Sequence, residues 1–373
     1  MSFQTVPMFP GDLYDAASRF ASQAAAAAPG PSSAQVRGQQ WSKVLEMGWP
    51  AVLVPQAQGG AGGTLPDLAA IVEATARQSL NLPIIERCAV APALLSALPQ
   101  ERARVLLEQV AAGEADLACA VQPDLLRGLD ALAGPDGSWE LEGTITLDMS
   151  LAASHTLVHV PAAQALLVLE AAQMPPPAMR YRSVDGRELA DIALRRVRVP
   201  ASQLLGSGAQ VQPAVDKALD LGALMSAAEV VGALGALIEQ TIAYLKTRTQ
   251  FGVHLSTFQA LRHRVVEMYV QYESASGLVA RIVHDGVEKG QLASRDVSLA
   301  KAYLGKVGRF GAEAAIQLHG GMGMTEELLS ARLAQRMLSC EFEYGDRFSH
   351  LTRLVDRGLA HSAQELHDEP VPA

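Results

Sequence analysis

The residues best suited to bind an anionic ligand lie at positions 248–252, a stretch that contains Arg248, Gln250, Phe251 and Gly252. Arg248 follows a long helical pattern. A cation is favoured at a helix C-terminus, where Gly252 could end the helix. A guanidinium is also a planar fork of donors that fits a pyrophosphate, and Phe251 could lie against an aromatic ring. The stretch therefore predicts either a simple helix end or a pyrophosphate site.

A second stretch, residues 317–323, begins with Gln317 and contains Gly320, Gly321 and Gly323. One glycine suffices to end a helix, so three within four residues indicate that another group approaches the backbone closely. A flexible turn between two helices would have the same composition. A Gly-x-Gly-x-x-Gly dinucleotide site is excluded, because no strand precedes these glycines and their spacing differs.

Other catalytic patterns are not found in the sequence. The nine histidines are scattered along the chain, His254 and His263 are nine residues apart and no HxH spacing occurs, so no metal site is predicted. No GxSxG sequence occurs, which leaves a hydrolase nucleophile unsupported. The three cysteines are odd in number and form no CxxC, which indicates a reducing compartment rather than a disulfide framework.

Composition and charge exclude further classes of protein. Hydrophobic residues make up 49% of the 373 residues and charged residues 18%, so extensive disorder is not expected. The net charge of −9, with no long basic run, argues against nucleic-acid binding. The first 16 residues lack the pattern of a signal peptide, and no uninterrupted apolar stretch of about 18 residues occurs. We therefore expect a cytoplasmic protein without a membrane span.

The spacing of apolar residues divides the chain into three zones. Residues 1–117 and 207–373 have helical spacing, whereas residues 118–206 have strand-like runs separated by proline and glycine turns. The middle zone predicts a small antiparallel sheet or barrel with strands at 117–121, 139–147, 156–160, 165–169 and 192–199. The last zone predicts a four-helix bundle with helices at 216–247, 257–284, 296–319 and onward from Thr325. The polar tail, residues 361–373, is expected to fray.

This layout and the two glycine-containing stretches resemble the acyl-CoA dehydrogenase family over nearly the whole chain. The similarity extends to Val54-Pro55 with Gly59-Gly60, and to 197–200 (VRVP) with 204–206 (LLG). The resemblance implies a mainly α fold with a small β domain, in which the last helices form a four-helix bundle.

The resemblance also implies an activity and partners. The activity is the α,β-dehydrogenation of acyl-CoA thioesters with FAD as cofactor and an electron-transfer flavoprotein as acceptor. The ADP half of FAD would lie across a subunit interface, in a homodimer, a homotetramer or a heteromer. The positions that would contact it are Arg248, Gln250, Phe251, Gln317, Gly320 and Gly321.

The sequence departs from the family at the catalytic base. The position of the glutamate that removes the substrate α-proton holds Tyr344, and a tyrosine with a pKa near 10 is a poor base at neutral pH. Glu343 is a substitute base only if a local irregularity of the helix turns its side chain towards the base position. The alternative family position, on the long helix before Arg248, holds Gly222, and Glu229 lies two turns further along.

The middle zone also departs from the family where the flavin ring would bind. The usual Thr-Glu-Pro is Val121-Gln122-Pro123, and the usual aromatic-x-Ser/Thr is 147–149 (LDM). This pattern resembles the small or partner subunits of heteromeric acyl-CoA dehydrogenases, such as the pimeloyl-CoA dehydrogenase small subunit. Three interpretations stay open: a flavin-dependent oxidoreductase, a non-catalytic partner that completes a shared FAD site, and an acyl-CoA-binding protein without turnover.

Overall fold

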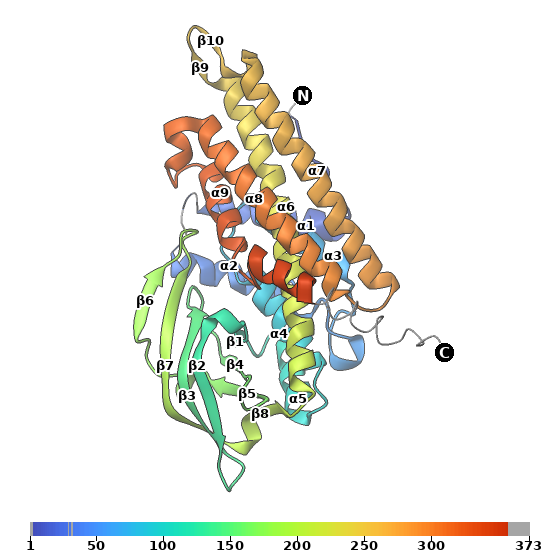
Figure 1. The fold of residues 1–373 in the computed structure, drawn as a ribbon, viewed down its shortest axis with the longest axis vertical. Coiled ribbons are helices and arrows are strands. Elements are labelled where there is room, and N and C mark those ends of the chain that lie inside the picture. The colour runs from blue at the N-terminus through green and yellow to red at the C-terminus, as the bar shows by residue number, and fades with distance from the viewer. Residues whose placement is uncertain (1–2, 29, 31–32, 357–373) are drawn as a thin grey trace, which may run out of the picture.

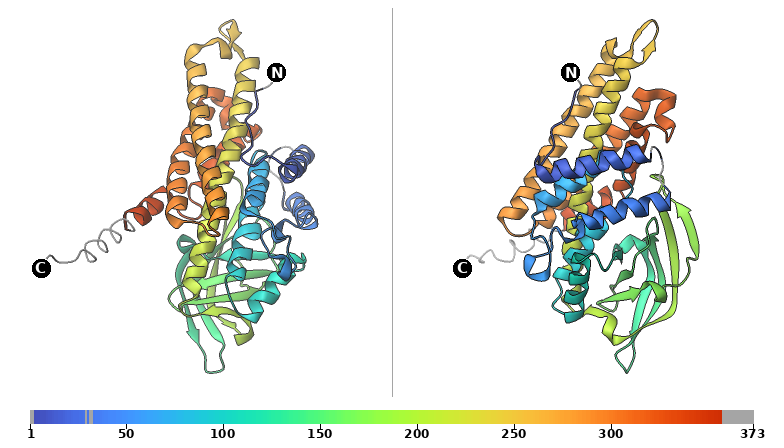
Figure 2. Two further views of the ribbon diagram at one scale, coloured as in Figure 1. Left: turned by 90° about the vertical axis from the view of Figure 1, so that its right-hand side faces the viewer. Right: turned by 180° about the vertical axis from the view of Figure 1, so that it is seen from behind.

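The structure, a computed structural model, describes residues 3–28, 30 and 33–356. A bundle of long helices occupies one end of the molecule and two β-sheets occupy the other, with the shorter helices of the first zone beside the junction (Figures 1 and 2). The strands of these two sheets begin at Leu117 and end at Ser207, and the first long helix begins at Val211. The predicted fold class, mainly α with a small β domain, is confirmed.

The first zone forms five helices: α1 (Asp12–Ala27), α2 (Ala34–Glu46), α3 (Leu65–Ala76), α4 (Ala91–Ser96) and α5 (Glu101–Ala111). Capping side chains fix two helix starts, because the Ser33 hydroxyl accepts a bond from the N–H of Val36 and Asp67 closes a capping box with Thr64. A single hydrophobic core joins these helices to the last zone. The two helical zones therefore pack as one body around shared apolar side chains.

The middle zone forms two four-stranded sheets, whereas the sequence predicts one small antiparallel sheet or barrel. One sheet has the strand order β1-β4-β5-β8 and the other β2-β3-β7-β6. β1 runs parallel to β4, and the other pairs are antiparallel. Their bounds are β1 Leu117–Ala120, β2 Leu126–Ala133, β3 Trp139–Asp148, β4 His155–Val160, β5 Ala165–Glu170, β6 Met179–Arg182, β7 Glu188–Val199 and β8 Leu204–Ser207.

The first of these sheets is buried on both faces, which explains why its strands are almost continuously apolar. Neighbouring residues of a strand point to opposite faces. In β4, Leu157 belongs to the core shared with the helices, whereas Val158 belongs to a second core between the sheets. The sheet thus forms a layer between the helices and the outer sheet.

The last zone contains α6 (Val211–Thr247), α7 (Gln259–Glu288), α8 (Ser294–His319) and α9 (Leu329–Cys340). Helix α6 runs through the centre of the molecule (Figure 1). It is long enough to cross a membrane, with a mean hydropathy of 1.9 in its most apolar window, but that window is entirely buried. A Cβ at Gly232 would lie 2.5 Å from the Glu73 carbonyl oxygen, so glycine allows α6 to approach α3 closely.

The fourth helix begins later than predicted. The Thr325 hydroxyl donates to the Met322 carbonyl at 3.0 Å instead of capping a helix, and α9 starts at Leu329. A further helix begins at Arg347, where Asp346 accepts from the N–H of Ser349 at 2.7 Å, and continues to the end of the described residues. The tail predicted to fray, residues 361–373, lies outside the described residues.

Candidate functional site

The two glycine-containing stretches lie together at the outer end of the helical bundle. Arg248 follows α6, and residues 249–254 form the hairpin of β9 (Thr249–Gln250) and β10 (Val253–His254) seen at the tip in Figure 1. The Tyr244 ring stacks on the His319 ring with centroids 4.5 Å apart, and its hydroxyl donates to the His319 carbonyl at 3.2 Å. The ends of α6 and α8 are thereby joined, so the two stretches form one surface, here called the outer site.

The polar side chains of the outer site are exposed and have no partner within the described part of the chain. Within the described residues, Arg248, Gln250 and Gln317 form no side-chain hydrogen bond or ion pair. Phe251 is 89% exposed, and its ring contacts that of Phe258 edge-on at 6.2 Å. The hydrogen-bonding capacity of these side chains is therefore available to a molecule outside this chain.

Two of the three glycines leave the backbone of the outer site open. Gly320 has φ 60° and ψ −140°, a conformation that residues with a Cβ rarely adopt. A Cβ built on Gly320 or Gly321 would meet nothing within 4 Å, whereas one on Gly323 would lie 2.8 Å from the Ile316 carbonyl oxygen. Gly323 is thus a packing residue, and Gly320 and Gly321 leave room for a ligand to approach.

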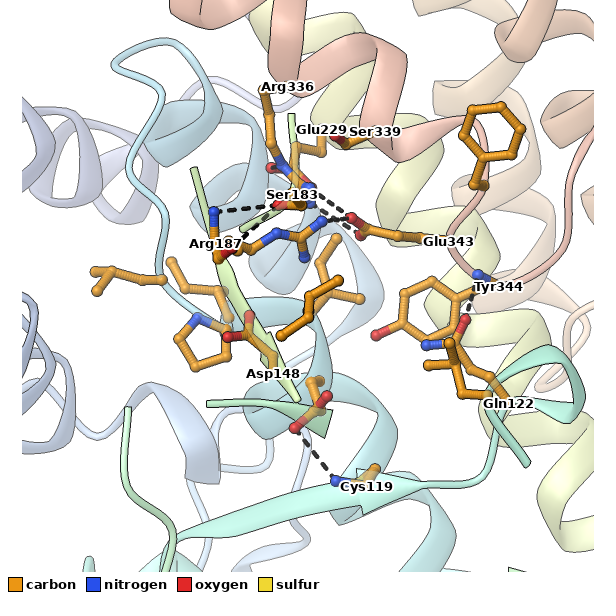
Figure 3. A pocket seen from close by; sticks show the side chains of 18 of the residues that line it. Cys119, Gln122, Asp148, Ser183, Arg187, Glu229, Arg336, Ser339, Glu343 and Tyr344 are labelled. Atoms are coloured by element: carbon orange, nitrogen blue, oxygen red, sulfur yellow. Dashed lines mark hydrogen bonds and ion pairs between the residues drawn. The ribbon is translucent and has the colours of Figure 1, made fainter. Parts of the chain in front are cut away.

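A separate cavity of about 360 Å³ lies where the sheets meet the helices (Figure 3). One wall is apolar, with Val72, Leu80, Leu82, Ile85 and Leu338 among its residues. The opposite wall carries charged side chains from the turn before β7, from α6, from α9 and from the segment after α9. We call this cavity the inner pocket.

Two arginines and three carboxylates form a connected network along the charged wall. Arg336 donates to Glu229 at 2.6 and 2.7 Å, to Asp185 at 2.9 Å and to Glu343 at 2.9 Å. Arg187 donates to Asp185 at 2.9 Å and also forms an ion pair with Glu343. Figure 3 shows both guanidinium groups directed at Glu343. The polar groups of this wall are therefore satisfied within the chain.

The network governs the protonation of Glu343. Burial by itself raises the pKa of this carboxyl, but Arg187 and Arg336 outweigh burial and lower the pKa to about 2. A carboxylate with so low a pKa is a weak base, and its oxygens are held by two guanidinium groups. The geometry therefore weighs against Glu343 as the substitute base.

Tyr344 lies beside the network with its phenol buried. Its N–H donates to the Gln122 side chain at 2.7 Å, and burial, with the nearby charge of Glu86, raises the phenol pKa well above 10. A Cβ built on Gly222 would lie 2.6 Å from the Tyr344 ring. The two positions at which the family places its base are thus neighbours in space, and the Tyr344 ring fills the corner between them.

Within the described residues, one group of side chains has ligand atoms close enough for a metal ion: Glu229, Cys340 and Glu343. Both carboxylates already bind the Arg336 guanidinium, which supplies the positive charge at this place. The charged residues at the inner pocket that were not singled out from the sequence are Glu86, Arg187 and Arg336, which line it, and Asp185, which binds both arginines. They come from distant segments, and no local spacing connects them.

Two family models match the chain. The model of the acyl-CoA dehydrogenase N-terminal domain matches residues 12–114, and that of the acyl-CoA dehydrogenase C-terminal domain matches residues 212–359, together more than half of the sequence. The chain belongs to the acyl-CoA dehydrogenase family. The members of this family are FAD flavoproteins, and the family predicted from the sequence is confirmed.

Individual acyl-CoA dehydrogenases resemble the chain over most of its length. Acyl-CoA dehydrogenase IpdE2 of Mycolicibacterium smegmatis is 29% identical over 290 residues, 77% of each chain. Butyryl-CoA dehydrogenase from Megasphaera elsdenii superposes with a TM-score of 0.81 and 19% identity, over 96% of this chain and 100% of that one. A chain of the ChsE4-ChsE5 complex from Mycobacterium tuberculosis superposes with a TM-score of 0.78 and 19% identity, over 98% of this chain and 100% of that one. The two structures share the acyl-CoA dehydrogenase fold.

Proposed function

We propose that this chain is an acyl-CoA dehydrogenase subunit that shares its flavin site with a second polypeptide of the same family. Its outer site contacts the ADP half of an FAD whose ring lies in the partner. The observation that carries the proposal is that Arg248, Gln250 and Gln317 are exposed and unbonded within the described part of the chain.

The outer site suits the ADP half of FAD in shape and charge. The Arg248 guanidinium offers a planar pair of donors to a diphosphate, and the amides of Gln250 and Gln317 add further donors. The exposed Phe251 ring offers an apolar face to an aromatic base. The open backbone at Gly320 and Gly321 lets the cofactor come close.

The inner pocket suits an acyl thioester, because its apolar wall can cover an acyl chain. The chemistry that FAD supplies, acceptance of the hydride that leaves the β-carbon, would depend on the partner, which holds the flavin ring. The positions at which the resemblance places the base hold Tyr344 and Gly222 instead of a carboxylate. The Tyr344 ring occupies the corner beside Gly222. Leu147, which lines the pocket, stands where the family has an aromatic residue against the flavin ring, and Met149 stands where the family has a hydroxyl. This asymmetry between the two sites favours a heteromer over a homo-oligomer.

Purification of the full chain, alone and as the native complex from its own cells, tests this proposal. We expect the chain alone to be colourless, and the complex to have flavin absorbance and a native mass equal to two different family chains plus FAD. A homo-oligomer with one FAD per chain would contradict the proposal and indicate a self-sufficient flavoprotein. Binding of acyl-CoA by a native complex that holds no flavin would also contradict it. That result would indicate a binding protein without turnover.

A further inference from the structure

The carboxylates of the inner pocket differ in what holds them. Glu229 and Glu343 are ion-paired with Arg336, and Asp148 accepts the N–H of Ser150 at 2.8 Å. Glu86 accepts one hydrogen bond, from the N–H of Cys119 in β1 at 3.2 Å, marked by a dashed line in Figure 3. It has no ion-pair partner among the described residues. Glu86 is therefore a pocket carboxylate that no arginine holds.

The backbone that carries Glu86 is unusual. Residues Ile85–Val90 form a π-helical turn, in which the N–H of Ala91 bonds to the Glu86 carbonyl, five residues back. Pro92 follows and has no N–H to continue a regular α-helical ladder. Such turns are rare and are often found at functional sites.

The π-helical turn directs Glu86 and Arg87 to different surroundings. Arg87 binds the carbonyl of Leu151 at 2.9 Å, pairs with Asp116 and lies over the Trp41 ring. Glu86 instead lines the inner pocket. The charge of Arg87 is therefore neutralised by Asp116, and Glu86 is free to face the ligand.

Glu86 faces the corner where the family's base is missing. Val90, one turn further along, has a methyl group 2.9 Å from the position of a Cβ on Gly222, and the Tyr344 ring lies against the same position. Glu86 and Tyr344 are close enough that the charge of the carboxylate raises the phenol pKa. The turn that carries Glu86 thus packs against both base positions from a third element.

The surroundings of Glu86 adjust its acidity to neutral pH. Burial raises the pKa of Glu86 most and the charge of Asp148 adds to it, whereas Arg87, the Cys119 N–H and Arg187 lower it, and the net pKa is about 7. The other titratable neighbours, the Tyr344 phenol and the Cys119 thiol, stay neutral because burial and the charge of Glu86 raise the pKa of each well above its ordinary value. A base with a pKa near the working pH is the most effective one.

We propose that Glu86 is the catalytic base of the inner pocket and removes the α-proton of a bound acyl thioester. This assignment rests on the proposed function, which places the thioester in this pocket. The Cα–H bond breaks, an O–H bond forms on Glu86, and the electron pair left on Cα delocalises into the thioester carbonyl. If no hydride leaves the β-carbon, the carboxyl returns a proton that has exchanged with solvent.

Deuterium exchange tests the assignment without redox turnover. The full chain is incubated in D2O with butyryl-CoA or octanoyl-CoA, and deuterium at Cα is measured by mass spectrometry alongside thioester binding by equilibrium dialysis. We expect exchange that increases with pH around a midpoint near 7. Glu86→Gln should reduce it by about 10²-fold or more, the contribution of a positioned base. Glu86→Asp should restore part of the rate, and the exposed control Glu142→Gln should retain it.

Three results would contradict parts of this account, and they can be told apart. Unchanged exchange in Glu86→Gln, or a loss confined to Asp148→Asn, would overturn Glu86 as the base. Thioester binding without exchange in the unmodified chain would also overturn it, while leaving the proposed function intact. Absence of thioester binding in both the chain and its native complex would instead overturn the proposed function.

Discussion

The outer site and the inner pocket differ in whether their polar side chains are paired within the chain. At the outer site, Arg248 and Gln317 are exposed and bind nothing within the described residues. In the inner pocket, Arg336 and Glu343 are bonded to each other and to further charged groups. Groups that serve another molecule must stay unpaired, whereas buried charges must be paired inside the chain. The comparison supports the proposal that the outer site serves a ligand held elsewhere, and the ion pairs of this wall of the pocket stabilise the fold.

The largest effect is expected from the centre of the network. Arg336→Met leaves Glu229, Asp185 and Glu343 without a shared cation in a buried site, and should lower the free energy of unfolding by about 3–5 kcal/mol. Arg198→Met, which removes the exposed pair with Asp136, should cost about 1 kcal/mol or less. Urea denaturation measures both variants. Equal losses would show that the network does not stabilise the fold more than a surface ion pair.

Arg248 provides the opposite case. Arg248→Ala should weaken flavin retention by the native complex by about 1.5–3 kcal/mol, the scale of a charge-assisted hydrogen bond, while stability of the chain stays nearly constant. Arg248→Lys should restore part of the retention, because an ammonium lacks the planar fork. Flavin content after dialysis is the measurement, with Arg281→Ala as the exposed control. Full occupancy in both Arg248 variants would reduce this arginine to a helix-end charge.

Valine variants of Gly320 and Gly321 distinguish blocked approach of the ligand from strain in the backbone. Gly320→Val should cost stability, on the order of 1–3 kcal/mol, because its positive φ disfavours a β-branched residue. Gly321→Val meets open space at an ordinary φ, so stability should change by about 0.5 kcal/mol or less. Its flavin retention should nevertheless fall, because the side chain blocks the backbone. Melting temperatures measure the change in stability and flavin content measures retention of the cofactor. Retained flavin in Gly321→Val would show that the glycine turn does not contact the cofactor.

A further effect concerns the pH dependence of Glu343. Its pKa in the folded chain is about 2, below the ordinary value of 4.5. The stabilisation is therefore complete above pH 4.5 and is lost as the pH falls towards 2. Glu343→Gln should destabilise the chain at pH 7 and have a shrinking effect between pH 4.5 and 2. A pH-independent difference in unfolding free energy would argue against the ion pairs as its cause.

The two stretches of the outer site could be singled out from the sequence because their determinants are local, and their contact with a cofactor stays a prediction. Arg248 to Gly252 and Gln317 to Gly321 are short stretches at helix ends, and residue type alone indicates what each could bind. The start of α9 was missed because Thr325 uses its hydroxyl as a donor to Met322 rather than as a cap. Local chemistry allowed both arrangements, and tertiary packing chose between them.

The inner pocket could not be predicted, because its residues meet only in the folded chain. Arg336 on α9 binds Asp185 from a β-turn and Glu229 from α6, and no spacing joins these three positions. Glu86 was overlooked because a π-helical turn places it in the pocket, whereas its apolar neighbours suggest ordinary core. Strand β2 was missed for a different reason, since Gly128, Asp130 and the alanines of this segment have little preference for a strand.

A structure of the native complex determined with FAD tests the central claim most directly. The account predicts that the Arg248 guanidinium lies within hydrogen-bond distance of the diphosphate of an FAD whose ring is bound by a different polypeptide. Gly320 and Gly321 should contact the same cofactor. An Arg248 that points into solvent, with the FAD diphosphate bound elsewhere, would contradict the account. So would a complex made only of copies of this chain, each holding its own flavin ring.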